Sequence, residues 1–318
     1  MKLRALLFLS IITIVLSCKR NNDSNDALDI PLPIDTLSSG WQKINTGIST
    51  YINDVWFFNS ADGLLCTRGG IYSSRDSGKT WNLKTSLLRN YINLFFVNNS
   101  VGFAQKPDSI SITQDGGNNW VTRKLPRSDV EDIHFVTPST GFAFGSGVAY
   151  KTIDTAKSWV SVTQNGSRAV FFIDQLRGYM HQADGYMYFS IDEGTTWQKK
   201  SNSNVSMGGN DYLFFSDINT GWLVNFNYGL FKTSNGGSDW SNVLSVNTGT
   251  EAAMDCFFAN NNEGVVSSTK RVFSTSNSGV DWKTEVIMHT RTVGELHFLD
   301  KNTGWVCCSD GILLRFKK

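Results

Sequence analysis

A tryptophan returns about every 40 residues along this chain, and this period constrains the fold more than any other feature. The successive intervals are 40, 39, 39, 38, 43 and 42 residues. The series is Trp41, Trp81, Trp120, Trp159, Trp197, Trp240 and Trp282. A phenylalanine six residues before a glycine recurs in step with it, as Phe57 with Gly63, Phe96 with Gly102, Phe135 with Gly141, Phe172 with Gly178, Phe215 with Gly221, Phe258 with Gly264 and Phe298 with Gly304. Self-similarity at such a period indicates adjacent copies of one supersecondary unit.

The unit itself consists of short β-rich runs separated by turn residues. In the first copy, residues 53–58, 64–67 and 71–74 are three such runs, and Trp81 opens a fourth. Asn, Ser, Asp and Gly lie between them, and none of the copies has the 3.6-residue period of a helix. Four short antiparallel strands in about 40 residues describe a propeller blade. The sequence therefore predicts an all-β, seven-bladed β-propeller over residues 41–318.

The two ends of the repeat region are incomplete in complementary ways. The last copy has Phe298, Gly304 and an apolar run at residues 312–316, but it lacks a tryptophan strand. The first tryptophan strand, residues 41–44, has no blade before it. We therefore predict that residues 41–44 complete the blade begun by residues 295–316, which would pair both free edges.

The first 40 residues do not follow the repeat. Lys2 and Arg4 precede an apolar run over residues 6–16, as in a signal peptide, and the run ends at Cys18 within a sequence that resembles a bacterial lipobox. We expect residues 1–17 to be removed, Cys18 to carry lipid, and residues 18–40 to form a flexible tether. Lys19 at the next position is typical of lipoproteins of the outer membrane, so we expect a lipid-anchored protein of the cell envelope, on either side of that membrane.

A second motif precedes the tryptophans. Residues 74–81 and 190–197 match S-x-D-x-G-x-T-W, and the other copies match in part. An Asp or Asn that caps backbone N–H groups, a glycine and a covering tryptophan suit a tight turn, so we interpret these residues as structural rather than catalytic or metal-binding. The set is Asp76, Gly78, Trp81, Asp115, Gly117, Trp120, Asp154, Trp159, Asp192, Gly194, Trp197, Asn235, Gly237, Trp240, Asn277, Gly279 and Trp282.

The motif resembles the Asp-box, or BNR repeat. Together with the aromatic residue after the repeated glycine, as in Gly221-Trp222, it makes residues 41–318 similar to the photosystem II stability and assembly factor family. That resemblance implies a propeller that holds or escorts a partner protein. Photosynthetic members carry an arginine cluster on one face. This chain departs from that pattern, because its candidate arginines fall at different blade positions, namely Arg68, Arg123, Arg168 and Arg291.

A candidate ligand site follows from the first strand of each blade, which should line the central channel. Nine residues before the repeated glycines, four of the seven positions are acidic, and another acidic residue stands one position earlier in the fifth blade. The candidate channel mouth is Asp54, Asp132, Asp211, Asp255 and Glu295. The alternative is that these are solvated residues where the strands begin. His134 and His297 share one place in these strands and are expected to be packing residues.

Composition limits the function. Without residues 1–17 the chain carries 27 basic and 28 acidic residues, which argues against nucleic-acid binding. No zinc-type cysteine spacing occurs, and we expect no cofactor and no metal. Cys66 and Cys307 occupy equivalent places in neighbouring blades, so the sequence allows either a disulfide between them or two buried free thiols. The redox state of Cys256 and Cys308 is likewise left open.

The function we expect is that of a non-enzymatic scaffold, monomeric, that binds a protein or glycan partner. The alternative is a carbohydrate-active hydrolase that uses the carboxylates of the channel mouth. Sialidases, which share the Asp-box, carry an Arg-Ile-Pro type motif ahead of the first one, and nothing in residues 41–74 matches it. Xyloglucan-cleaving relatives use two propellers, where this chain has one.

Overall fold

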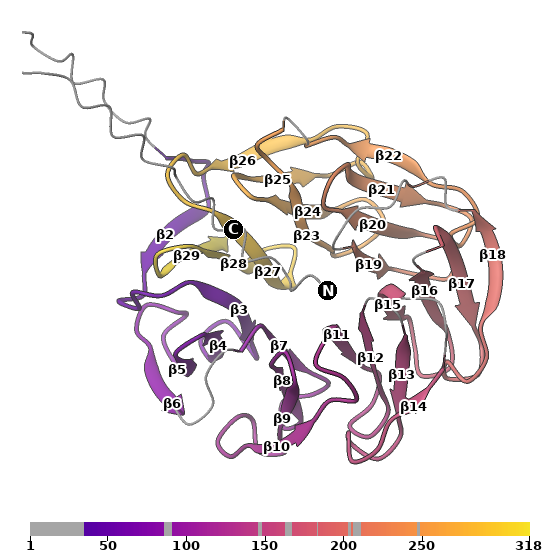
Figure 1. The fold of residues 1–318 in the computed structure, drawn as a ribbon. Helices are drawn as coiled ribbons and strands as arrows, with labels where there is room; N and C mark the ends of the chain where they lie inside the picture. Colours follow the sequence, from indigo (N-terminus) through magenta and orange to yellow (C-terminus); the bar gives the residue numbers. More distant parts are fainter. Residues whose placement is uncertain are drawn as a thin grey trace, which may run out of the picture.

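The computed structural model describes residues 35–85, 91–145, 148–162, 167–182, 184–202, 205, 211–246 and 249–318. Within these ranges the chain forms strands and turns, and seven antiparallel sheets stand around a central axis (Figure 1). The predicted seven-bladed β-propeller is confirmed. The described part of the chain contains no helix that is long and apolar enough to span a membrane. Residues 1–17, Cys18 and the tether up to residue 34 lie outside the described residues.

Each of the first five blades is a meander of four strands, and its first strand lies nearest the axis (Figure 1). Blades 1 and 2 are β3 (Ile52–Phe57), β4 (Gly63–Thr67), β5 (Gly70–Ser74), β6 (Asn82–Thr85), β7 (Asn93–Phe96), β8 (Gly102–Gln105), β9 (Ser109–Thr113) and β10 (Val121–Lys124). Blades 3, 4 and 5 are β11 (Val130–Phe135), β12 (Gly141–Gly145), β13 (Ala149–Thr152), β14 (Val160–Ser161), β15 (Ser167–Phe172), β16 (Gly178–Gln182), β17 (Tyr186–Ser190), β18 (Gln198–Asn202), β19 (Asp211–Phe215), β20 (Gly221–Asn225), β21 (Gly229–Thr233) and β22 (Ser241–Leu244).

The two ends of the chain share the last two blades. Blade 6 is β23 (Ala253–Phe258), β24 (Gly264–Ser268), β25 (Arg271–Thr275), β26 (Lys283–Ile287) and β1 (Thr36–Leu37). Blade 7 is β27 (Val293–Asp300), β28 (Thr303–Cys308), β29 (Ile312–Lys317) and β2 (Trp41–Asn45). β2 pairs with β29 in antiparallel register, with Trp41 opposite Phe316. The predicted closure is therefore confirmed: the N-terminal tryptophan strand completes the C-terminal blade.

The boundary of the propeller differs from our expectation of a flexible tether up to residue 40. Thr36 and Leu37 pair with Ile287 and Val286 as a fifth strand on blade 6. The Asp35 carboxylate accepts a hydrogen bond from the Lys43 ammonium at 2.8 Å. A free edge on β26 and an apolar Leu37 that packs on the core of blades 6 and 7 explain why the chain is held here before the first repeat begins.

The phenylalanine–glycine pair of the repeat is the packing unit of each blade. Phe57 lies directly opposite Gly63 in the register of β3 and β4. A Cβ atom added to Gly63 would come within 2.6 Å of the Phe57 ring, and every other repeated glycine would meet its own phenylalanine at 2.3 to 2.7 Å. The glycine is required because the ring lies flat on its backbone. This contact explains why the pair occurs in all seven copies.

The same ring also joins its blade to the one before. Phe57 stacks on Trp305 of blade 7 at 3.5 Å between ring centroids, and it makes a T-shaped contact with Trp81 of its own blade at 5.9 Å. In blade 7 the edge partner of Phe298 is Trp41, at 6.3 Å. β2 thus supplies the tryptophan that blade 7 lacks in sequence, as the repeat predicted.

The turns before the tryptophans are held by side-chain oxygens. In blade 4, the Asp192 carboxylate accepts hydrogen bonds from the Thr196 hydroxyl at 2.6 Å and from the Thr196 N–H at 2.9 Å. The Trp197 indole N–H donates to the Gly194 carbonyl at 3.1 Å. These bonds, first the Thr196 hydroxyl and then the backbone N–H groups, lower the pKa of Asp192 to about 2. A carboxyl with such a pKa is ionised at neutral pH and cannot act as a general acid.

The Asn-containing turns keep the same geometry with the donor and acceptor exchanged. In blade 5 the Asn235 side-chain N–H donates to the Asp239 carboxylate at 2.8 Å. In blade 6 Asn277 donates to Asp281 in the same way. The exchange of Asp and Thr for Asn and Asp therefore preserves one turn contact, which is what a structural role requires. In blade 3 Ala156 takes the glycine place with φ of 59°.

Removal of the closing strand should destabilise the whole ring. A chain without residues 1–46 loses β2, exposes the edge of β29 and leaves Phe298 without Trp41, which is only 7% exposed. We expect its urea midpoint to fall steeply and Trp41→Ala to cost about 3–5 kcal/mol. The matched control lacks residues 1–40 and loses only β1. Equal midpoints for the two truncated chains would contradict closure as a source of stability.

Candidate functional site

Two layers of side chains from the inner strands line the axis of the propeller. Because side chains two residues apart point the same way on a strand, positions nine and seven before each repeated glycine share the channel side. The first layer, called here the mouth layer, is Asp54, Asn93, Asp132, Ala169, Tyr212, Asp255 and Glu295. The second, called the aromatic layer, is Trp56, Phe95, His134, Phe171, Phe214, Phe257 and His297.

Two aspartates of the mouth layer join neighbouring inner strands. Asp54 accepts hydrogen bonds from its own next residue, the Val55 N–H, at 2.7 Å and from the Leu94 N–H of blade 2 at 2.8 Å. Asp255 repeats this between blades 6 and 7, with the Cys256 N–H at 2.7 Å and the Leu296 N–H at 3.1 Å. Both oxygens of each carboxylate therefore serve backbone donors, so the alternative of simply solvated residues does not describe them.

Asp132 and Asn93 form a comparable connection between blades 2 and 3. Asp132 accepts from the Ile133 N–H at 2.8 Å and from the side-chain amide of Asn93. Asn93 also donates to the buried Gln105 side chain at 3.3 Å. The mouth layer is thus tied into the backbone of the ring in at least three blades, and this fixes its positions.

The charges of the mouth layer converge from several blades. Burial first, and then the negative charge of Glu295, raise the pKa of Asp54 and of Asp255 well above the usual carboxyl value. The low-dielectric surroundings of Tyr212 in the channel and the charges of Asp255 and Glu295 also raise the pKa of its hydroxyl. Groups on blades 1, 5, 6 and 7 influence one another only because they meet near the axis, so the mouth is the place where the acidic groups of these blades converge.

Asp211 is not part of this mouth. Its side chain is fully buried, and its carboxylate lies 2.9 Å from His181 Nδ1 of blade 4 and accepts the Asn225 amide N–H at 2.9 Å. Asp211 precedes Tyr212 by one residue, so strand alternation turns it away from the axis and toward the interface of blades 4 and 5. Our placement of Asp211 with the other acids is therefore corrected.

The aromatic layer was missed as a set by the sequence analysis, which marked only its two histidines. Trp56 contacts Phe95 at 5.6 Å and His297 at 4.5 Å between centroids. His134 lies 5.8 Å from both Phe95 and Phe171. Burial lowers the pKa of His134 and of His297 to about 4, so both are neutral at pH 7. The signal was present, because all seven residues stand seven positions before a repeated glycine.

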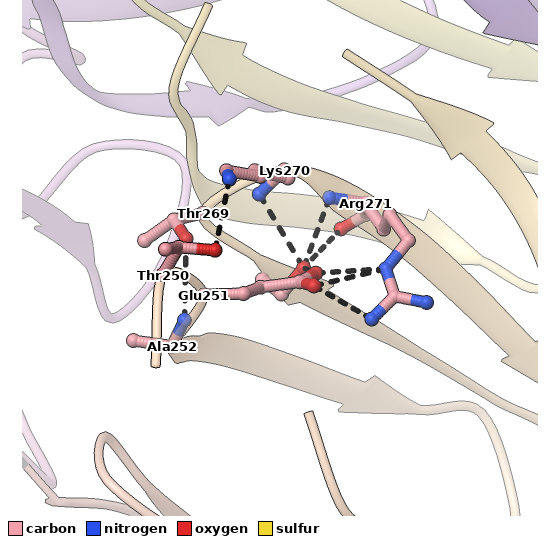
Figure 2. A network of polar contacts seen from close by, with 7 residues as sticks. Thr250, Glu251, Ala252, Thr269, Lys270 and Arg271 are labelled. Carbon is pink, nitrogen blue, oxygen red and sulfur yellow. Dashed lines mark hydrogen bonds and ion pairs between the residues drawn. The ribbon is translucent and has the colours of Figure 1, made fainter. Parts of the chain in front are cut away.

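The rim around the mouth holds its charges in pairs. In Figure 2 the Arg271 guanidinium meets the Glu251 carboxylate, with Nε and Nη2 donating at 2.9 and 2.6 Å. Lys270 donates to the Thr250 hydroxyl at 3.2 Å in the same network. On blades 2 and 3, Arg127 and Asp129 form a second ion pair at 2.6 Å. Two ion pairs, Arg271 with Glu251 and Arg127 with Asp129, therefore lie among the described connections at this end.

The arginines named above do not converge. The Arg123 guanidinium donates to the Thr155 carbonyl, and Arg291 lies 3.7 Å from Asp35. Arg68 is exposed in the turn between β4 and β5, and nothing is described for the side chain of Arg168. The four cysteines are buried free thiols, namely Cys66, Cys256, Cys307 and Cys308, so no disulfide joins Cys66 to Cys307. Within the described ranges, no group of His, Cys, Asp and Glu residues is arranged to hold a metal ion.

Comparisons with known proteins agree with this architecture. The family model of the photosynthesis system II assembly factor YCF48 matches residues 34–175. A search of curated proteins found no match. The structure of YCF48 bound to D1 peptide superposes with a TM-score of 0.69 at 19% identity, over 88% of this chain and 98% of that one. YCF48 from Cyanidioschyzon merolae gives 0.68 at 17% identity, over 88% and 99%.

Glycosidases also match, but over less of their length. The Niastella koreensis GH74 enzyme superposes with a TM-score of 0.65 at 14% identity, over 87% of this chain and 53% of that one. Identities of this size show the fold alone. The two YCF48 structures match over nearly their whole length, whereas the enzyme has as much chain again beyond the match. The chain is a seven-bladed β-propeller similar to the photosystem II assembly factor YCF48.

Proposed function

We propose that this protein is a membrane-anchored, non-enzymatic propeller that binds a positively charged segment of a protein partner in the cell envelope. Lipid on Cys18 would hold it at the membrane, with the outer membrane as the expected site. The mouth layer is the binding site in this proposal. The acidic, backbone-anchored mouth is the observation that carries it, because acidic side chains of several blades are fixed at one end of the axis.

The chemistry of the mouth favours binding over catalysis. A general acid or nucleophile needs a carboxyl oxygen that is free to approach a substrate. Asp54 and Asp255 use both oxygens on backbone N–H groups across blade boundaries. A carboxyl group fixed in this way attracts a cation once it is ionised, that is, at a pH above its raised pKa. The similarity to YCF48, one structure of which is bound to a peptide, supports a protein segment as the ligand.

The aromatic layer adds a second attraction for the same ligand. Lys and Arg side chains are attracted to aromatic ring faces, by about 0.5–1 kcal/mol at exposed sites. Trp56 and Phe95 lie one step below the carboxylates along the channel. A basic side chain that enters the mouth would meet carboxylates first and ring faces next. This order of groups suits Lys and Arg better than it suits an acidic segment.

Binding should depend on the sign of the peptide charge. We expect a 12-residue lysine-rich peptide to bind in fluorescence anisotropy at low salt, and its glutamate counterpart not to bind. Glu295→Gln should weaken binding about 3- to 10-fold, which corresponds to roughly 1 kcal/mol. Binding should strengthen as pH rises above the ordinary carboxyl range, because the pKa values of Asp54 and Asp255 are raised and both groups gain their charge only at higher pH. Asp108→Asn, an exposed rim change, is the control. Equal binding of the two peptides would refute the proposal.

The mouth layer should also make stability fall as pH rises. Because the pKa of Asp255 is raised, its carboxyl group stays protonated in the folded chain at pH values where it is already ionised in the unfolded chain. The free energy of unfolding therefore falls as pH rises from about 4, the ordinary carboxyl pKa, through the pKa of the folded state. Glu295→Gln leaves the burial of Asp255 in place and removes the neighbouring charge that adds to its effect on this pKa. We expect it to stabilise the propeller by about 1 kcal/mol at pH 7 and by less at pH 4. Parallel urea titrations at the two pH values measure this. An equal effect at both would contradict the charge coupling.

A carbohydrate-active hydrolase is the second candidate, favoured by the similarity to GH74 enzymes, including a xyloglucanase from Xanthomonas campestris. The chain spans 52% of that enzyme. We expect the purified chain to release no reducing sugar from xyloglucan, because two of its mouth carboxylates, Asp54 and Asp255, are committed to backbone N–H groups. Release of sugar that Asp132→Asn abolishes would instead support the hydrolase.

A further inference from the structure

The N-terminal segment joins the propeller at the same end as the mouth layer. Each outer strand runs toward the connection that begins the next inner strand, so Ile287 is at the mouth end of β26. β1 is antiparallel to β26, with Thr36 opposite Ile287 and Leu37 opposite Val286. Chain direction therefore places the residue before β1, Asp35, at the mouth end. After β1 the chain crosses the opposite end and returns as β2.

Contacts of Asp35 fix this position. Its carboxylate accepts the His289 N–H at 3.0 Å and the Lys43 ammonium at 2.8 Å, and Arg291 lies 3.7 Å away. His289 and Arg291 belong to the connection that leads from β26 into β27, the strand that carries Glu295. The segment that would lead to the membrane therefore leaves the propeller beside the connection to a mouth-layer residue.

On the other side of β1, Ser38 holds the chain to the same blade. The Ser38 N–H donates to the Glu285 carbonyl at 2.8 Å. Residues 35–38 are held against β26 by three kinds of contact. These are the backbone pairing of Thr36 and Leu37, the interactions of the Asp35 carboxylate, and the Ser38 hydrogen bond. The exit direction is thus set by several contacts.

The chain between the exit and the anchor is short. Seventeen residues separate Asp35 from Cys18, counted from Cys18 itself. A chain of that length can reach at most about 60 Å. A five-residue outer strand alone rises about 17 Å, and turns add to the thickness at each end. Because the segment starts at the mouth end, the path from Asp35 to a membrane on that side is shorter than the path to a membrane on the opposite side by at least this thickness.

We propose that β1 holds the mouth end of the propeller toward the membrane, so that the partner it receives is the basic, membrane-proximal segment of an integral membrane protein. This inference rests on the proposed anchor at Cys18 and on the proposed binding function. Basic residues flank the membrane spans of many proteins, and they match the negative mouth in sign.

Orientation can be measured by energy transfer from the protein to the lipid surface. The full-length gene is expressed, and the anchored chain is purified from membranes and reconstituted in vesicles that contain an acceptor-labelled phospholipid. A thiol-reactive donor is placed by Asp108→Cys at the mouth end of blade 2, or by Gln114→Cys at its opposite end, both exposed positions. The four native thiols of the propeller are buried, so the introduced thiol reacts selectively.

We expect transfer from position 108 to be at least about twofold higher than from position 114, since β9 alone separates them by about 17 Å. Leu37→Pro, which disrupts β1 pairing, should reduce this ratio. Equal or reversed transfer, or a ratio unchanged by Leu37→Pro, would overturn the orientation while leaving the anchor intact. If the wild-type chain fails to float with vesicles, or if Cys18→Ser floats equally well, the anchor itself is overturned and the orientation with it.

Discussion

A phenylalanine ring lying flat on a glycine backbone is the contact on which this propeller depends. The ring of Phe57 covers Gly63, stacks on Trp305 of the preceding blade and makes a T-shaped contact with Trp81. One side chain therefore joins two strands of its own blade, its outer tryptophan and its neighbouring blade. The phenylalanine–glycine contact returns in every blade, and in blade 7 the tryptophan beside the phenylalanine is Trp41, from the other end of the chain.

The acidic residues near the axis also serve more than one role. In Asp54 and Asp255 a carboxylate that could attract a ligand also binds N–H groups of two adjacent inner strands. Ring geometry and mouth charge are therefore coupled, and a neutral substitution at either position would change both. Glu295 is the better residue with which to separate charge from architecture, since its charge, after burial, raises the pKa of both aspartates.

Much of the fold could be predicted from the sequence, because the repeat period, the turn residues and the incomplete ends are local patterns. Of the five predicted mouth residues, Asp54, Asp132, Asp255 and Glu295 share the register nine before a repeated glycine, and the structure brings their charges together. Asp211 failed because one step along a strand reverses the direction of the side chain. The aromatic layer was missed because its members look like ordinary core residues until the strands are arranged around an axis.

The sequence by itself determined the blade, the number of blades and the strand that closes the ring, since each depends on residues within one repeat or on a count of repeats. Tertiary structure alone decided which acidic side chains lie close together, because Asp54 and Glu295 become neighbours only when blade 7 lies beside blade 1. It also decided that residues 36 and 37 belong to the propeller, since two polar-flanked residues carry no pattern of their own. They pair because closure brings the free edge of β26 next to them.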